Sequence, residues 1–197
     1  MRKIKHIYNI FYSKFFLFDD RLVLMTAGAV VGICAGLAAV ALRLSLATVL
    51  ELFEPYRHYA WAFILPGIGA LLSFLFLDKV MREGAGHGVP EVIYAVSRRG
   101  GLLRFRSTFS RLVSSFFTIS SGGSAGPEAP VVMSGSAIGS NIAKFLGLND
   151  RQRMTLVGCG TAGAIAAIFH APVAGLIFSV EIILGEWKFV NIIPITI

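Results

Sequence analysis

The feature that most constrains this chain is a glycine- and proline-rich segment at residues 121–130, with the sequence SGGSAGPEAP. It separates two apolar stretches, residues 105–120 and 131–146, that are both predicted to be helical. The glycines let the backbone approach a bound group closely, and Pro127 stands where a new helix is favoured to begin. That helix would present free N–H groups and the positive end of its dipole to an anion. The segment therefore predicts an anion site in an apolar region, with the carboxylate of Glu128 beside it.

The composition is typical of a multi-pass membrane protein, because 55% of the 197 residues are hydrophobic and only 15% are charged. There are 18 Lys and Arg against 11 Asp and Glu, which gives a net charge of +7. The basic residues lie between apolar runs and not along one amphipathic face, so they predict basic cytoplasmic loops and no nucleic-acid partner. Cys34 and Cys159 lie within apolar runs at a spacing that fits no metal site. No metal or cofactor is predicted.

The first third of the chain predicts an interfacial helix and two spans. Residues 1–20 combine basic and aromatic side chains, which favours a helix on the cytoplasmic membrane surface, with a poorly ordered basic tail as the alternative. Residues 21–53 are the first span, and Gly28, Gly32 and Gly36 give it a smooth face for close packing. Residues 60–77 are the second. Basic residues before the first span and after the second place the N-terminus in the cytoplasm.

A second glycine-rich loop, residues 84–91, precedes an apolar helix at 92–96 that is too short to span. This pattern predicts a re-entrant segment, because irregular backbone at membrane depth is tolerated only where protein or a water-filled cavity surrounds it. The basic residues at 98–106 are placed in the cytoplasm. Residues 105–120 then continue into 131–146, so Arg151 and Arg153, in a polar turn at 149–153, are expected on the outer side.

The last part of the chain predicts more interrupted helices. Residues 156–169 are apolar up to a break at His170 and Pro172, and residues 173–184 form another short helix. Residues 189–197 begin an apolar segment too short to span, which indicates an N-terminal piece of a longer protein. The predicted fold class is all-α: a polytopic membrane protein with tilted, broken and re-entrant helices.

The two glycine-rich loops predict two helix N-termini that meet near the middle of the membrane, one at Val89 and Pro90 and one at Pro127 and Glu128. Backbone dipoles at such ends bind a dehydrated anion without holding it as tightly as a full positive charge, which suits permeation. An ionised Glu128 would occupy the place of the anion, and a protonated one would swing away. The alternative is that Glu128 only stabilises the first turn of its own helix.

These residues resemble the CLC family of chloride channels and proton–chloride antiporters. Residues 123–130, GSAGPEAP, resemble that family's G-x-x-G-R-E-G-P, and residues 86–90, GHGVP, resemble its G-S-G-I-P. Residues 163–181 are similar to its next helix pair. The resemblance implies a non-enzymatic homodimer in the cell (inner) membrane, with one chloride pore per subunit built from two inverted repeats. Residues 21–197 would be the first repeat, truncated at its C-terminus, and residues 1–20 a separate N-terminal helix.

The resemblance also implies the site. Glu128 aligns with the family's gating glutamate, and the implied anion-binding residues are His87, Gly88, Val89, Gly126, Glu128 and Ala129. His87 replaces a serine whose hydroxyl contacts the anion in the family. A neutral imidazole still donates one N–H, and a charged one binds anions more strongly, whereas the alternative is a loop histidine facing cytoplasmic water. Pro127 replaces an arginine and removes a backbone donor, and Ala129 replaces a glycine.

The family's antiporters carry a second glutamate that relays protons, and it would fall at Ile182. Isoleucine binds no proton, so the resemblance favours a channel or an uncoupled transporter, with proton–chloride antiport as the alternative. Glu181, the neighbouring residue, is a possible proton relay only if the helix is rotated there, because neighbours on a helix point about 100° apart. Its alternative is a structural acid at the cytoplasmic rim.

An intramembrane serine hydrolase is a third hypothesis, from another class. Residues 122–126, GGSAG, match G-x-S-x-G, with Ser124 as nucleophile and His170 as base. That motif requires a strand before the serine and an acid that orients the histidine. A membrane helix is predicted before Ser124, and His170 has no evident acidic partner, so the hydrolase is the least favoured hypothesis.

Overall fold

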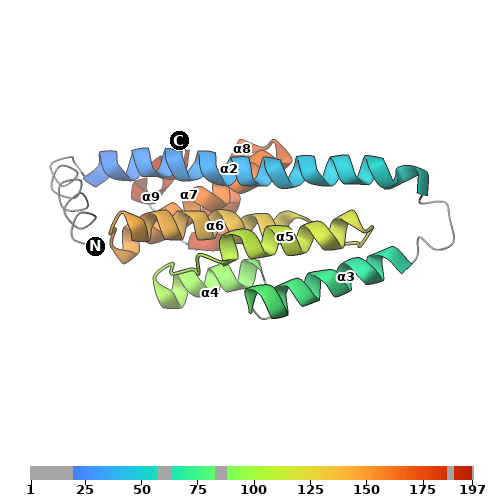
Figure 1. The fold of residues 1–197 in the computed structure, drawn as a ribbon. Coiled ribbons are helices and arrows are strands. Elements are labelled where there is room, and N and C mark those ends of the chain that lie inside the picture. Colours follow the sequence, from blue (N-terminus) through green and yellow to red (C-terminus); the bar gives the residue numbers. More distant parts are fainter. Residues whose placement is uncertain (1–19, 57–63, 83–87, 186–188, 197) are drawn as a thin grey trace, which may run out of the picture.

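A computed structural model describes residues 20–56, 64–82, 88–185 and 189–196. The described residues form helices joined by turns and loops, as the predicted all-α class requires (Figure 1). The elements are α2 (Asp20–Phe53), η1 (Glu54–Tyr56), α3 (Leu65–Leu75), η3 (Phe76–Met81), α4 (Val89–Arg99), α5 (Ser107–Ser120), α6 (Glu128–Phe145), α7 (Asp150–Phe169), α8 (Pro172–Phe178), η4 (Ser179–Leu184) and α9 (Phe189–Thr196). The predicted helix at residues 1–20 and the loop around His87 lie outside these ranges, apart from Asp20.

Helix α2 is the first predicted span, and it runs along one side of the molecule (Figure 1). Within the described ranges it is the one helix long and apolar enough to cross a membrane, with a mean hydropathy of 2.2 over Leu22–Phe53. Its glycine face packs closely on another helix, as predicted, and the structure identifies that helix as α7. A Cβ on Gly163 would lie 2.8 Å from Cα of Gly32, and one on Gly28 would lie 3.2 Å from Sγ of Cys159. The missing side chains therefore let the two helices approach closely.

Two predicted boundaries were wrong. The second predicted span, residues 60–77, does not end at residue 77 but continues through the π-helix η3 to Met81, whereas its predicted start lies outside the described residues. The predicted polar turn at 149–153 is the first turn of α7. Asn149 accepts a hydrogen bond from the Gln152 N–H, and the Gln152 side chain accepts one from the Asn149 N–H, so a capping box extends the helix into the polar sequence.

Helices α6 and α7 form the centre of the molecule and cross at glycines. A Cβ on Gly135 would lie 2.8 Å from Cβ of Ala164, and one on Gly139 would lie 2.6 Å from the carbonyl carbon of Leu156. The α6–α7 interface also buries a hydroxyl pair, with Oγ of Ser136 lying 2.7 Å from Oγ1 of Thr161. Small residues and paired hydroxyls are what a helix interface inside a membrane requires.

Helix α6 does not continue in the direction of α5, as the sequence analysis expected, but reverses it. Ser134 Oγ donates to the Thr108 carbonyl at 2.5 Å, and Ser140 Oγ donates to the Gly101 carbonyl at 2.6 Å. Later residues of α6 thus pair with earlier residues of the α4–α5 segment, which is an antiparallel arrangement. The glycine-rich residues 121–127 form the turn between the two helices.

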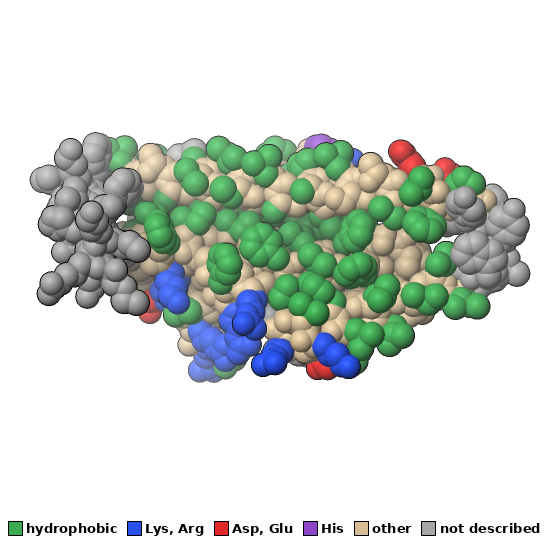
Figure 2. All heavy atoms as spheres, in the orientation of Figure 1, with side chains coloured by type: hydrophobic (Ala, Val, Ile, Leu, Met, Phe, Trp, Pro, Cys, Tyr) green, Lys and Arg blue, Asp and Glu red, His purple; other side chains and the backbone are tan. Residues whose placement is uncertain are grey.

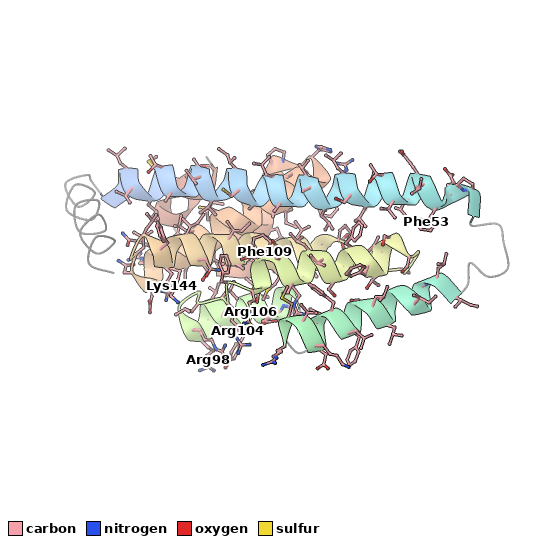
Figure 3. The ribbon with its side chains drawn as sticks, in the orientation of Figure 1. Phe53, Arg98, Arg104, Arg106, Phe109 and Lys144 are labelled. Carbon is pink, nitrogen blue, oxygen red and sulfur yellow. The ribbon has the colours of Figure 1, made fainter. Side chains whose placement is uncertain are left out.

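The reversal corrects the predicted placement of Arg151 and Arg153. Nε of Arg153 donates to the Gly100 carbonyl at 2.8 Å, and a Cβ on Gly100 would lie 2.9 Å from Cγ of Asp150. The start of α7 therefore lies at the same end of the molecule as the basic loop after α4, and not on the opposite side of the membrane. Phe53 lies at the other end, and Lys144 lies near the basic end (Figure 3).

We expect this arrangement to appear in side-specific labelling of single cysteines. Ser97→Cys and Arg151→Cys, both exposed, should react with a membrane-impermeant maleimide from the same side, whereas Glu54→Cys should react only from the other side. The measurement compares intact cells with inverted vesicles, in a background where Cys34 and Cys159 are replaced by alanine. Labelling of positions 97 and 151 from opposite sides would contradict the reversal of α6.

Candidate functional site

The N-termini of α4 and α6 are in contact. Gly88, the N-cap of α4, is buried and has φ of +61°, a backbone conformation that side chains disfavour. A Cβ on Gly88 would lie 2.9 Å from Cβ of Ala129, in the first turn of α6. Glycine at this position therefore permits both the backbone conformation and the close approach. The structure brings together two of the predicted anion-binding residues.

The first turn of α4 leaves a backbone donor beside this contact. Glu91 and Val92 donate their N–H groups to the Gly88 carbonyl at 3.1 and 3.3 Å, and Pro90 has no N–H. The N–H of Val89, at the first helical position, has no acceptor within its own helix. Val92 is completely buried in the core, which fixes the direction of the helix axis. The positive end of the α4 dipole thus lies at the start of α6.

The first turn of α6 presents Glu128 and Ala129 at the same place. Pro127 is its N-cap, and the Val131 N–H donates to the Pro127 carbonyl at 3.1 Å. The side chain of Glu128 is exposed and folds back over Gly126, so that a Cβ on Gly126 would lie 2.8 Å from Cδ of Glu128. Gly126 therefore leaves the room that the carboxylate occupies. An acid at this position also stabilises its own helix, so this geometry is compatible with both predicted roles of Glu128.

Other predicted residues lie apart from this contact or outside the described ranges. His87 is not among the described residues. Glu181 lies in the π-helix η4 and is exposed, as is Ile182. Ile183 is buried in the same core cluster as Val92, so η4 packs beside α4. The predicted proton relay therefore remains a prediction for a residue on a neighbouring helix.

Sequence reasoning missed an ion pair between the first turn of α4 and helix α5. Nη2 of Arg111, on α5, lies 3.7 Å from Oε2 of Glu91, and the Arg111 side chain is only 11% exposed. A buried guanidinium in an apolar helix is costly unless a carboxylate compensates it. The sequence signal was available, because Arg111 is the basic residue inside the apolar stretch 107–120. Its partner was hidden because Glu91 belongs to another helix.

The predicted hydrolase residues do not adopt the geometry that their motif requires. The segment before Ser124 is helix α5 and not a strand. His170 ends α7 with φ of +53°, and its imidazole contacts the guanidinium of Arg43, a cation rather than an orienting acid. Arg43 also donates to the Ile168 carbonyl at 3.3 Å, so this contact closes the C-terminus of α7 against α2.

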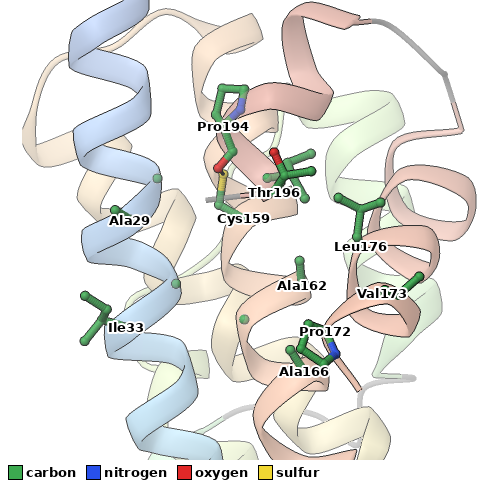
Figure 4. A pocket seen from close by; sticks show the side chains of 14 residues that line it. Ala29, Ile33, Cys159, Ala162, Ala166, Pro172, Val173, Leu176, Pro194 and Thr196 are labelled. Atoms are coloured by element: carbon green, nitrogen blue, oxygen red, sulfur yellow. Dashed lines mark hydrogen bonds between the residues drawn. The ribbon is translucent and has the colours of Figure 1, made fainter. Parts of the chain in front are cut away.

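An apolar groove of about 450 Å³ lies between α2, α7, α8 and α9. Ile33, Ala162, Val173 and Leu176 are among the side chains that line it (Figure 4). Of the predicted anion-binding residues that the structure describes, none contributes to its walls. The groove is therefore separate from the meeting point of α4 and α6.

The contact between α4 and α6 predicts a coupling between residues 88 and 129. Gly88→Ala should lower stability by about 1–3 kcal/mol, because it combines a strained backbone with a steric clash. Adding Ala129→Gly should recover the part due to the clash, which gives a coupling of about 1 kcal/mol in a double-mutant cycle of thermal unfolding in detergent. Gly67→Ala is the control, because a Cβ there meets nothing within 4 Å. Strict additivity of the two substitutions would contradict the contact.

Comparison with known proteins finds relatives of one kind. The family model of the voltage gated chloride channel matches residues 69–197. The H(+)/Cl(−) exchange transporter ClcA of Citrobacter koseri is 30% identical over 183 residues, which cover 88% of this chain and 38% of that protein. Chloride channel protein C of Dictyostelium discoideum is 34% identical over 142 residues, covering 61% of this chain and 19% of that protein.

A solved structure shares the fold. The crystal structure of a slow cyanobacterial Cl−/H+ antiporter matches with a TM-score of 0.68 and 21% identity, covering 91% of this chain and 45% of that one. The chain thus spans less than half the length of each of these relatives. The match to the family model extends over residues that include both glycine-rich loops and the helices that follow them. The chain therefore belongs to the voltage-gated chloride channel (CLC) family, as the resemblance implied.

Proposed function

We propose that this chain supplies the first half of a chloride pathway across a membrane, in which Glu128 gates passive or uncoupled permeation. The observation that carries the proposal is the contact between the N-termini of α4 and α6 at Gly88 and Ala129. Backbone N–H groups and two converging helix dipoles stabilise an anion there. The anion-binding set is His87, Gly88, Val89, Gly126, Glu128 and Ala129.

The proposed gate works by competition between two negative groups. Ionised, the carboxylate of Glu128 occupies the dipole ends that would otherwise bind chloride. Protonated, it loses its charge and leaves the dipole ends to the anion. Because Gly126 has no side chain, the carboxylate has room to fold back over the α5–α6 turn. Anion flux should therefore be larger when Glu128 is protonated than when it is ionised.

Membrane orientation and assembly complete the proposal. Residues 1–20 form an N-terminal cytoplasmic helix, and residues 21–197 are the first repeat of a homodimeric transporter in the cell membrane. The basic residues after α4 lie at the same end as Arg153, and an excess of Arg and Lys marks the cytoplasmic side. Relatives named as chloride channels and chloride exchangers support chloride as the solute.

A second candidate, proton–chloride antiport, is favoured by the local structure around Glu181. The i→i+5 hydrogen bonds of a π-helix hold more residues per turn than an α-helix, so η4 changes the direction in which successive side chains point. Such a change of rotation would let the Glu181 side chain take the place of the family's relay glutamate, which aligns with Ile182 in this chain. π-Helical segments also occur frequently at functional sites.

We expect Glu128→Gln to mimic the protonated gate. In liposomes containing the full-length protein, chloride flux at pH 7 should rise by about tenfold, equivalent to ~1.4 kcal/mol of lost competition, and should depend little on pH. Glu51→Gln, at an exposed carboxylate near the far end of α2, is the matched control and should leave the pH profile unchanged. A variant at position 128 with the pH dependence of the parent protein would rule out the gate.

Measuring proton and chloride movement together separates the two candidates. Uncoupled permeation predicts no proton movement against its gradient when a chloride gradient is applied. Antiport predicts such movement, and Glu181→Gln should abolish it while chloride flux continues, because an amide cannot carry a proton. Ser179→Ala is not a suitable control, because Ser179 Oγ donates to the Gly158 carbonyl at 2.7 Å, so Ser97→Ala, at an exposed site, is used.

A further inference from the structure

The segment that joins α4 to α5 forms an exposed surface of cations and aromatic rings, which is not used by the anion pathway. Figure 2 shows Lys and Arg side chains gathered at this end of the molecule, with hydrophobic side chains beside them. Figure 3 labels Arg98, Arg104 and Arg106 on this side of the molecule, and Phe109 above them on α5. We call these residues, with Phe105, the basic–aromatic surface.

The cations of this surface are not neutralised by the described part of the chain. The ion pairs among the described residues join Arg111 to Glu91 and Arg153 to Asp150. Neither pair includes an arginine of this surface. Nη1 of Arg106 donates to the Met81 carbonyl at 3.3 Å, a neutral acceptor that leaves the charge uncompensated. The three exposed guanidinium groups therefore attract an anionic partner, and each has donors arranged to bind a phosphate.

The aromatic side chains of the surface point to a partner that is also apolar. Phe105 is 65% exposed and Phe109 is 54% exposed, and their rings meet edge to face with centroids 5.9 Å apart. Exposed phenylalanines beside arginines are what an interfacial membrane contact presents: the rings enter the boundary with the acyl chains and the cations stay at the headgroups. An acidic protein segment would satisfy the arginines without covering these rings.

The backbone under the surface is fixed in place. The Leu103 N–H donates to Ser140 Oγ at 2.9 Å, and Ser140 Oγ donates in turn to the Gly101 carbonyl. Nε of Arg153 donates to the Gly100 carbonyl, so the segment is attached to both α6 and α7. A preorganised surface loses little conformational freedom on binding, which favours a specific contact over a diffuse attraction.

We infer that the basic–aromatic surface binds the phosphate headgroups of anionic phospholipids in the leaflet at the basic end of the protein. The guanidinium groups contact the phosphates, and Phe105 and Phe109 contact the upper part of the acyl chains. This inference does not depend on the role of Glu128, because it uses solvent-exposed residues of α4, α5 and the segment between them, and not residues of the proposed anion site. It goes beyond the general excess of basic residues on one side, since it assigns a bound lipid to named side chains.

The test uses full-length protein in bilayers, with Phe105→Trp as a fluorescent reporter and the other tryptophans, Trp61 and Trp187 among them, replaced by phenylalanine. Phosphatidylglycerol or phosphatidylcholine with brominated acyl chains is added at equal mole fraction to otherwise identical bilayers. We expect quenching to report enrichment of phosphatidylglycerol around the reporter by about fivefold, the factor that corresponds to the attraction of one cation to an anionic membrane. Raising the salt concentration should reduce the enrichment.

The variants decide whether the arginines carry this enrichment. Arg98→Gln, Arg104→Gln and Arg106→Gln together should abolish it, and the three Arg→Lys substitutions, which keep the charge, should retain most of it. If the glutamine variant fails to fold, loss of enrichment at high salt in the parent protein replaces it. Equal quenching by both lipids, or enrichment that survives the glutamine substitutions, would overturn the inference. Reversal by a soluble acidic peptide but not by anionic vesicles would also overturn it, in favour of a protein partner.

Discussion

The structure depends on backbone polar groups being satisfied wherever a helix is interrupted. Within a membrane an unpaired N–H or C=O costs several kcal/mol, so broken helices need partners at the break. Here buried serines of α6 provide them: Ser134 binds the Thr108 carbonyl, and Ser140 binds both the Gly101 carbonyl and the Leu103 N–H. These bonds fix α6 antiparallel to α5. The N-terminus of α6 is thereby held at Gly88, and its first N–H groups have no acceptor within their own helix.

The sequence predicted those features of the fold that are carried by local signals. The apolar length of α2, its glycine face, and the starts of α4 and α6 at proline-containing loops all follow from residues close together in the chain. The direction of α6 does not, because hydropathy reports that a segment is apolar and not which way it runs. The bonds that decide it join residues far apart in sequence, such as Ser140 and Gly101. The start of α7 was missed for another reason: a capping box made a polar sequence helical.

In the candidate site, too, local sequence signals were predicted and contacts between distant residues were not. Gly88, Gly126 and Glu128 were identified from two short motifs, and the contact at Ala129 follows once both helices begin where proline favours it. The pairing of Arg111 with Glu91 was beyond sequence reasoning, because it links the second turn of α5 to the first turn of α4. The corrected direction of α6 also removes the conflict in charge placement: Arg153 and the basic segment after α4 now lie at one end, as membrane insertion favours.

The charges around the α4 N-terminus bear on the proposed passage of an anion. A full positive charge in a poorly hydrated region would bind chloride too tightly to release it, whereas the partial charges of helix ends allow exchange. Arg111 is such a full charge, and it is buried close to α4. Its pairing with Glu91 cancels most of its field at a distance, since opposite charges 3.7 Å apart act as a dipole. Pro127, where the family has an arginine, removes a further positive charge. Both features leave the backbone as the principal source of positive potential at this place, which is the condition that the proposed competition between Glu128 and an anion requires.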